Sequence, residues 1–278
     1  MLLADQTEGK QTMPKFVCVF IQILLVLTTG RIALASNITL ETTTTVTVDQ
    51  GTANVLITVI NKGDEPAYNV RIQAEVNKET KAGPHEEQLN VNSEQAQHLA
   101  FEMKGMKPGR YPMTLYVDYT DRNQYPSTAL SVVYVDYQDH GSSRISGEMK
   151  PVEISERGRI KIKTKNLENT DKNTKVRLVL PKEFSGEPPV AELKLPPGGE
   201  ETLVFEMKNL AALPGSRYPI YAVIEYDDEE YHYANAVSGM VTVLESQSVF
   251  TVYQTPLIAA ALVLIAIVIY LNVRRKRT

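Results

Sequence analysis

Two blocks of almost purely apolar residues stand near the ends of the chain, and a long alternating pattern lies between them. The blocks cover residues 16–29 and 257–271. Between residues 36 and 245, the chain contains successive runs in which apolar residues recur at every second position, which is the period of a strand with one buried face. No segment of this region has a helical period. The pattern predicts an all-β region between two apolar ends.

Short sequences recur in the β region at a spacing of 104 to 107 residues. The sequence FEMK at 101–104 returns at 205–208, and RYP at 110–112 returns at 217–219. Asn61 is likewise matched by Asn166. Matches this dense along a hundred residues are improbable by chance. The spacing therefore predicts two copies of one module, copy one at 36–141 and copy two at 142–246.

Each copy has several runs whose alternate residues form one apolar face. In copy one these inward residues are Val55, Ile57 and Val59 in one run, Leu99, Phe101 and Met103 in another, and Tyr111, Met113, Leu115, Val117 and Tyr119 in a third. About seven such strands in roughly 100 residues indicate an immunoglobulin-like β-sandwich. The cores must rest on aliphatic, Tyr and Phe side chains, because the chain has no Trp and its single Cys lies outside both copies.

Part of copy one resembles known surface domains. The sequence ITVINKG at 57–63, followed by Ala67 and by NV at 69–70, is similar to the signature of bacterial and archaeal surface sandwiches. PGRY at 108–111, leading to YVDY at 116–119, resembles the end of those domains. The CARDB and NEW3 families, cell-adhesion-related and glycosidase-associated domains, share this pattern. The resemblance implies an immunoglobulin-like fold, an envelope location and a non-catalytic interaction role, and it assigns no binding residue.

The first apolar block is typical of an export signal. Lys15 precedes it and ALA at 33–35 follows it as a cleavage sequence, so residues 1–35 are predicted to be a secretory signal peptide. Met13 is an alternative start, because the residues before it are polar. An N-terminal membrane anchor is the alternative interpretation of the same block. The only cysteine, Cys18, would leave with the signal, so the mature chain is predicted to contain no disulfide.

The second apolar block predicts a transmembrane helix over 247–273. Every residue from 257 to 271 is apolar, and Pro256 suits the first turn of a helix. Four cations follow at once and orient the span by the positive-inside rule: Arg274, Arg275, Lys276 and Arg277. The tail, 274–278, is then cytoplasmic and both modules lie outside the membrane. A buried core helix is the competing interpretation, which the adjacent cations disfavour.

Charge is distributed unevenly along the chain. The whole chain has 29 Lys and Arg against 33 Asp and Glu. Seven of these cations and two of these carboxylates lie in the two ends, so residues 36–255 carry 22 cations against 31 carboxylates. An acidic exported region is unlike a nucleic-acid-binding surface, which needs clustered Lys and Arg.

The sequence offers little catalytic or metal-binding chemistry. The four His residues have no metal-ligand spacing, and no nucleotide or hydrolase motif occurs, so we expect neither an enzyme nor a cofactor. The acidic run 227–230 suggests calcium ligands, although a solvated turn is the simpler interpretation. Asn37 begins the sole N-x-S/T sequon, which matters only where the host glycosylates exported proteins.

Matching outward positions differ between the copies. Lys161, Lys163 and Lys165 form a basic row on copy two, which suggests either an anionic polymer ligand or, more simply, pairing with Glu153 and Glu206 on neighbouring strands. Copy one has Leu56 and Ile60 at the two ends of the matching row. These two aliphatics are candidate contacts with copy two, with a partner or with a membrane-proximal complex.

The combined features favour a single-pass membrane protein that presents two sandwiches to a protein partner in the same membrane or envelope. An accessory or structural subunit of an envelope complex fits this arrangement. A carbohydrate-binding or adhesion module is the alternative. Tyr125, Tyr231 and Tyr233 are then the candidate sugar-stacking residues, because the chain lacks Trp.

Overall fold

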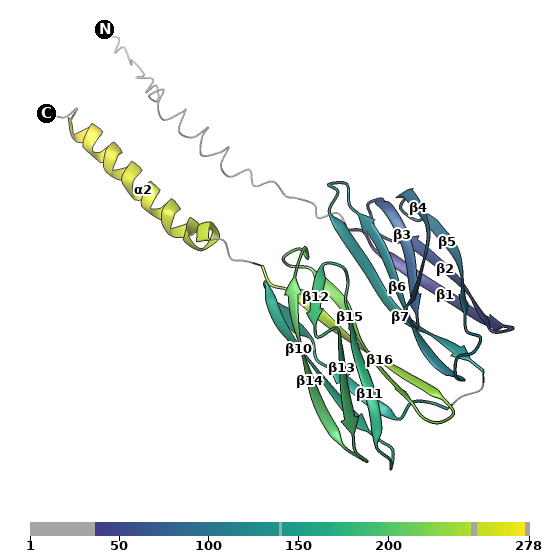
Figure 1. Cartoon of the computed structure of the whole chain (residues 1–278). Helices are drawn as coiled ribbons and strands as arrows, with labels where there is room; N and C mark the ends of the chain where they lie inside the picture. Colours follow the sequence, from purple (N-terminus) through teal and green to yellow (C-terminus); the bar gives the residue numbers. More distant parts are fainter. Residues whose placement is uncertain (1–36, 139–140, 246–248, 276–278) are drawn as a thin grey trace, which may run out of the picture. The chain divides into compact units, whose positions relative to one another are not determined.

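The computed structural model describes residues 37–138, 141–245 and 249–275. The predicted signal peptide and the last tail residues, 276–278, lie outside the described residues. The strands of copy one are β1 (Leu40–Asp49), β2 (Thr52–Asn61), β3 (Ala67–Val76), β4 (Glu79–Leu89), β5 (Glu94–Glu102), β6 (Gly109–Thr120) and β7 (Pro126–Tyr137). Those of copy two are β8 (Ile145–Met149), β9 (Val152–Ile154), β10 (Arg157–Asn166), β11 (Lys172–Val179), β12 (Phe184–Glu187), β13 (Val190–Leu195), β14 (Glu200–Asn209), β15 (Arg217–Asp227) and β16 (His232–Val243) (Figure 1).

Each copy is built from two sheets that face each other across an apolar core. In copy one, the order β1-β2-β5 faces β7-β6-β3-β4. In copy two, β12-β14-β10-β8 faces β13-β11-β15-β16, with β9 added beyond β16. One parallel bridge, His232 to Gly109, joins β16 to β6, so one sheet continues from copy two into copy one. The predicted all-β class is confirmed.

The period-two pattern places its residues as predicted. Of the five positions predicted inward on β6, the first four are buried, and Tyr119 is half-buried. Phe101 and Phe205, which the repeat matches, are 1 % and 0 % exposed and are the largest fully buried side chains of their cores. Burying an aromatic side chain of this size contributes roughly 2–3 kcal/mol through the hydrophobic effect. The two cores therefore rest on equivalent positions.

Copy two differs from copy one in its first strand. β1 runs antiparallel to β2 along its whole length, whereas β8 pairs with β10 and the chain then crosses to pair β9 in parallel with β16 in the other sheet. The crossing occurs at Pro151, whose missing N–H cannot continue the ladder of β8. The prediction that Glu153 lies on a strand beside the basic row is thus wrong, because β9 places it in the other sheet. Glu148 stands beside Lys163 instead.

Residues Val249–Arg275 form the helix α2, which contains Pro256 and ends on Arg274 and Arg275. Within the part of the chain that the structure describes, no helix has both the length and the apolar character needed to cross a membrane.

Candidate functional site

The two copies share a third apolar cluster at their junction. Leu130 of β7, Val179 of β11 and Val223 of β15 are buried, at 6 %, 1 % and 0 % exposure. Half-buried side chains from both copies pack around them: Tyr116, Val132, Tyr221 and Ala236. These residues occupy the outward positions of their sheets, opposite the two sandwich cores. The sheet that continues between the copies is therefore covered on both faces where they meet.

The sequence contains a signal for this junction that strand periodicity alone does not use. Tyr221 to Ile224 is apolar without interruption, and so are residues 132–135 and 178–180. Uninterrupted apolar runs of this kind are typical of strands buried on both faces. Ala222 and Ile224 were predicted to face inward, whereas the outward positions, including Val223, and Leu130 on β7 were not predicted to be buried.

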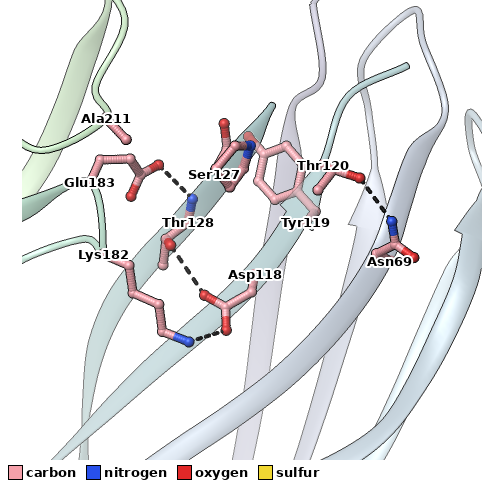
Figure 2. Close-up of a pocket in the computed structure, with 10 residues that line it drawn as sticks. Asn69, Asp118, Tyr119, Thr120, Ser127, Thr128, Lys182, Glu183 and Ala211 are labelled. Atoms are coloured by element: carbon pink, nitrogen blue, oxygen red, sulfur yellow. Dashed lines mark hydrogen bonds and ion pairs between the residues drawn. The ribbon is translucent and has the colours of Figure 1, made fainter. Parts of the chain in front are cut away.

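Glu183 is the most unusual charged group at the junction. It follows β11 in copy two, is 3 % exposed, and its Oε1 accepts the N–H of Thr128 in copy one at 2.8 Å. Its Oε2 is buried without a hydrogen-bond partner among the described residues. Burial raises the pKa of Glu183, and the hydrogen bonds from Thr128 only partly offset that rise. Figure 2 shows this carboxylate reaching across from one copy to the other.

The Thr128 contact has a structural reason. In copy two, β9 covers the edge of β16 at its last three residues, 241–243, whereas β7, the equivalent strand of copy one, is paired only with β6 among the described strands. An uncovered edge presents free N–H groups that can pair with another chain. Glu183 takes one of these N–H groups, so a side chain of copy two protects part of the open edge of copy one.

Asp118 of β6 collects polar contacts beside Glu183. It accepts hydrogen bonds from Gln73 Nε2 at 2.9 Å and from Thr128 Oγ1 at 3.1 Å, and it forms an ion pair with Lys182 of copy two (Figure 2). A second ion pair, Arg177 with Glu75 at 3.6 Å, also joins the copies. Charge-assisted bonds that depend on direction set the relative orientation of two surfaces more than they add affinity.

A stacked aromatic pair lies at another part of the junction. The rings of Tyr111 and His232 are 4.2 Å apart and within 8° of parallel. The His232 N–H donates to the carbonyl of Pro108 at 2.9 Å. Its Nδ1 lies 2.8 Å from Asp227, and Glu225 lies 3.5 Å from Nε2. Burial acts to lower the pKa of His232, but these two carboxylates outweigh burial and raise it.

Gly109 is required for the approach of His232. A Cβ at Gly109 would lie 2.2 Å from the carbonyl oxygen of His232, which is a backbone atom and cannot turn aside. The glycine of the PGRY sequence therefore serves the contact between copies, a role that sequence reasoning did not identify.

A small cavity opens between the copies next to Glu183. It has a volume of about 280 Å³. Its lining comes from the β6–β7 end of copy one and from Lys182, Glu183 and Ala211 of copy two (Figure 2). The Oε1 atom of the carboxylate that it adjoins is engaged by the N–H of Thr128, so this carboxylate links the two copies beside the cavity.

The predicted contact residues Leu56 and Ile60 lie elsewhere. Both are half-buried on the outer face of the β1-β2-β5 sheet, where Leu56 stands between Thr45 and His98. The junction uses β6 and β7 instead. Arg274 and Arg275 end α2, and Lys276 and Arg277 lie outside the described residues.

The basic row of β10 is partly neutralised, as cross-strand pairing predicts. Arg159 pairs with Glu206 and Lys163 pairs with Glu200, each at 2.7 Å. Lys161 faces Val204 rather than a carboxylate. Glu206 was predicted beside this row, and Glu200 was not.

The acidic run after β15 closes its own turn. Asp228 Oδ1 accepts the N–H groups of Glu230 and Tyr231, at 2.9 and 2.7 Å, and Asp227 faces His232. Among the described residues, no three His, Cys, Asp or Glu side chains are grouped to hold a metal ion. Tyr233 stacks on Tyr226 at 4.9 Å.

No family model matches the sequence, and no curated protein matches it. Solved structures that match this chain include a Porphyromonas gingivalis W83 protein of unknown function, with 11 % identity over 73 % of this chain and 99 % of that one, at a TM-score of 0.34. They also include a PapD-like domain of human CEP192, with 11 % identity over 43 % and 99 %, at a TM-score of 0.29. A third is the E. coli chaperone DraB, with 9 % identity over 36 % of this chain at a TM-score of 0.28; this chain covers 54 % of DraB. The structural neighbours thus include PapD-like, immunoglobulin-like β-sandwich domains.

Proposed function

We propose that this chain is a non-catalytic interaction protein whose two sandwiches act as one rigid body. The observation that carries the proposal is the junction: the cluster of Leu130, Val179 and Val223, together with the bond from Glu183 to Thr128. A flexible pair of domains needs no buried contact, whereas an apolar cluster with directional polar bonds fixes their relative orientation. A fixed orientation places the outer faces of both sandwiches at a set angle for a partner.

The proposed location is outside a membrane, with the C-terminus cytoplasmic. Support comes from the sequence: an export-like block ending in ALA at 33–35, and an uncharged run that ends on Arg274 and Arg275. Epitope tags placed before Asn37 and after Thr278 test this orientation by protease protection in sealed cells. Accessibility of both tags, or of neither, contradicts it.

The resemblance to the CARDB and NEW3 families supports the same role. It rests on the NKG turn of copy one and on the PGRY sequence, whose Gly109 lies against copy two. An envelope complex that needs a rigid spacer or scaffold is the kind of assembly we propose for this chain.

The rigid-body proposal is tested by in-cell photocrosslinking of the full chain. A photoreactive residue at Leu56 reports on the outer face of copy one, and the Leu130→Asp variant opens the junction. We expect the photoreactive residue at Leu56 to give discrete protein adducts in a chain with the wild-type junction. These adducts should be lost in the Leu130→Asp variant and kept in Leu213→Asp, the matched control at an exposed position. Adducts that persist after the junction opens would refute rigid presentation. Binding of the chain to a glycan array through Tyr231 and Tyr233 would instead favour the carbohydrate-binding alternative.

A further inference from the structure

The outer face of copy one is acidic at its ends and uncharged in its middle. On β1, β2 and β5 the outward residues include no Lys or Arg. The face carries four exposed carboxylates, which have no ion pair in the described part of the chain: Glu41, Asp49, Glu94 and Glu102. On the central strand β2, Leu56 and Thr58 lie in the uncharged middle, and Ile60 lies at one end between Glu41 and Glu94.

The matching face of copy two carries the opposite charge. Its β10 contributes Arg159, Lys161, Lys163 and Lys165, and Lys150 follows β8. Glu206 and Glu200 form ion pairs with two of these cations, and Glu148 also stands beside Lys163. Lys161 is left beside Val204, which is 46 % exposed. A hollow of about 530 Å³ lies along this row, and its charged lining consists of four cations and two carboxylates: Lys150, Arg159, Lys161, Lys163, Glu148 and Glu153.

These are equivalent surfaces of one repeat. Lys161 occupies in copy two the position that Leu56 has in copy one, and Lys165 the position of Ile60. The junction between the copies uses the other sheet of each sandwich, so it covers neither face. The two faces carry opposite charges, with aliphatic side chains on one and Val204 exposed on the other.

We propose that the basic face of copy two binds the acidic face of copy one in a second molecule of this chain. The contact is heterologous, since the two surfaces differ, and repeating it links molecules head to tail. This inference deepens the proposed interaction role by naming a partner, and it rests on that role.

The contact is expected to be weak and sensitive to salt. Three paired strands of nine or ten residues span roughly 33 Å by 14 Å, at ~3.3 Å per residue and ~4.8 Å between strands, which is near the small end of specific interfaces. Exposed charges at its rim steer association and are screened within about 10 Å at 0.1 M salt. Leu56, Ile60 and Val204 then provide the apolar part of the contact.

Co-purification of two differently tagged full-length chains in mild detergent tests the proposal. We expect the wild-type chains to co-purify at about 50 mM salt and to lose most of the signal, about fivefold or more, at about 500 mM. Two variants each reverse one face, Lys161→Glu with Lys165→Glu, and Glu41→Lys with Glu94→Lys. Each gives a chain with two faces of like charge and is expected to abolish co-purification.

The rescue experiment makes the test specific. A chain with all four substitutions has its two charges exchanged and is expected to co-purify again. The control variants reverse equal charges on the other sheets: Lys175→Glu with Lys194→Glu, and Glu86→Lys with Glu87→Lys. They are expected to behave as wild type, and thermal unfolding confirms that every variant is folded.

Three outcomes overturn the inference: no wild-type co-purification at low salt, association that survives reversal of one face, or failure of the fourfold exchange to restore it. If self-association is absent while the Leu56 crosslinks capture a different protein, the second copy is excluded as partner and the proposed interaction role stands. If neither occurs, both fail.

Discussion

Asn61 and Asn166 hold the same turn in the two copies through three equivalent hydrogen bonds, and Asn166 Nδ2 also donates to the Pro196 carbonyl at 3.1 Å. Each is fully buried, and each Nδ2 donates to a carbonyl four residues later, at 2.8 Å. Each Nδ2 also donates to the carbonyl of a strand's last residue, Leu89 of β4 or Leu195 of β13, at 3.1 Å. Each Oδ1 accepts an N–H two residues later, from Gly63 or from Glu168.

This clamp explains a difference between the copies. Copy one has glycine at position 63 and copy two has Glu168 at the equivalent position, but the acceptor of the N–H is the asparagine in both. The asparagine, and not the glycine, is therefore the shared requirement of the turn.

Replacing Asn61 with Ala is expected to lower the free energy of unfolding by about 2–4 kcal/mol, because buried carbonyls lose their donor. Asn166→Ala is expected to have a similar effect in copy two. Denaturant titration measures both changes. Asn54→Ala, at an exposed position of β2, is the control. A change of less than about 0.5 kcal/mol for Asn61→Ala would contradict the assigned role of the clamp.

Replacing Leu130 with Ala is expected to weaken the junction while leaving both sandwich cores intact. Truncating a buried leucine typically costs about 2–5 kcal/mol, and here the loss falls on the contact between the copies. Calorimetry is expected to show one unfolding transition in the wild type and two in the variant. Leu213→Ala, at an exposed loop position, should leave the single transition unchanged. One unshifted transition for Leu130→Ala would show that the cluster does not couple the copies.

Glu183 is expected to make the junction more stable in mild acid. Because its pKa in the folded chain is raised above the ordinary value of 4.5, the folded state holds the proton more tightly than the unfolded state. The stabilisation is present in full below 4.5 and is lost as the pH rises through the raised value. Thermal unfolding between pH 4 and pH 7, measured on wild type and on Glu183→Gln, tests this. The neutral amide should flatten the dependence, and an unchanged slope would exclude Glu183 as its source.

His232 is expected to add a second pH dependence of the same sign. Its folded pKa is raised above 6.5, so its protonated form stabilises the fold below that value and this contribution is lost as the pH rises through the raised pKa. The charged or titratable groups that face it are Glu225, Asp227 and Tyr111. Imidazole NMR titration reads the pKa directly. A His232 pKa at or below 6.5 would contradict the prediction, and His232→Gln should remove this part of the slope.

Strand periodicity predicted the interior and missed the junction for one physical reason. Alternation reports only which side of a strand is apolar, and it identified the positions of Val55, Phe101 and Phe205 because each packs inside its own sandwich. Leu130 and Val223 occupy the opposite side, where an apolar residue does not indicate burial unless another domain is known to cover that side. The crossing at Pro151 was missed in the same way, since periodicity does not say which sheet a strand joins.

The sequence by itself determined the β-strands, their inward faces, the internal repeat and the basic row of copy two, because local alternation and residue identity set these features. Only the tertiary structure decided that Glu183 covers the open edge of β7, that His232 stacks on Tyr111 and that Glu153 lies in the other sheet. Those contacts join residues that are far apart in the chain and at unrelated positions of the repeat. Their partners depend on how whole sheets meet, which no local pattern specifies.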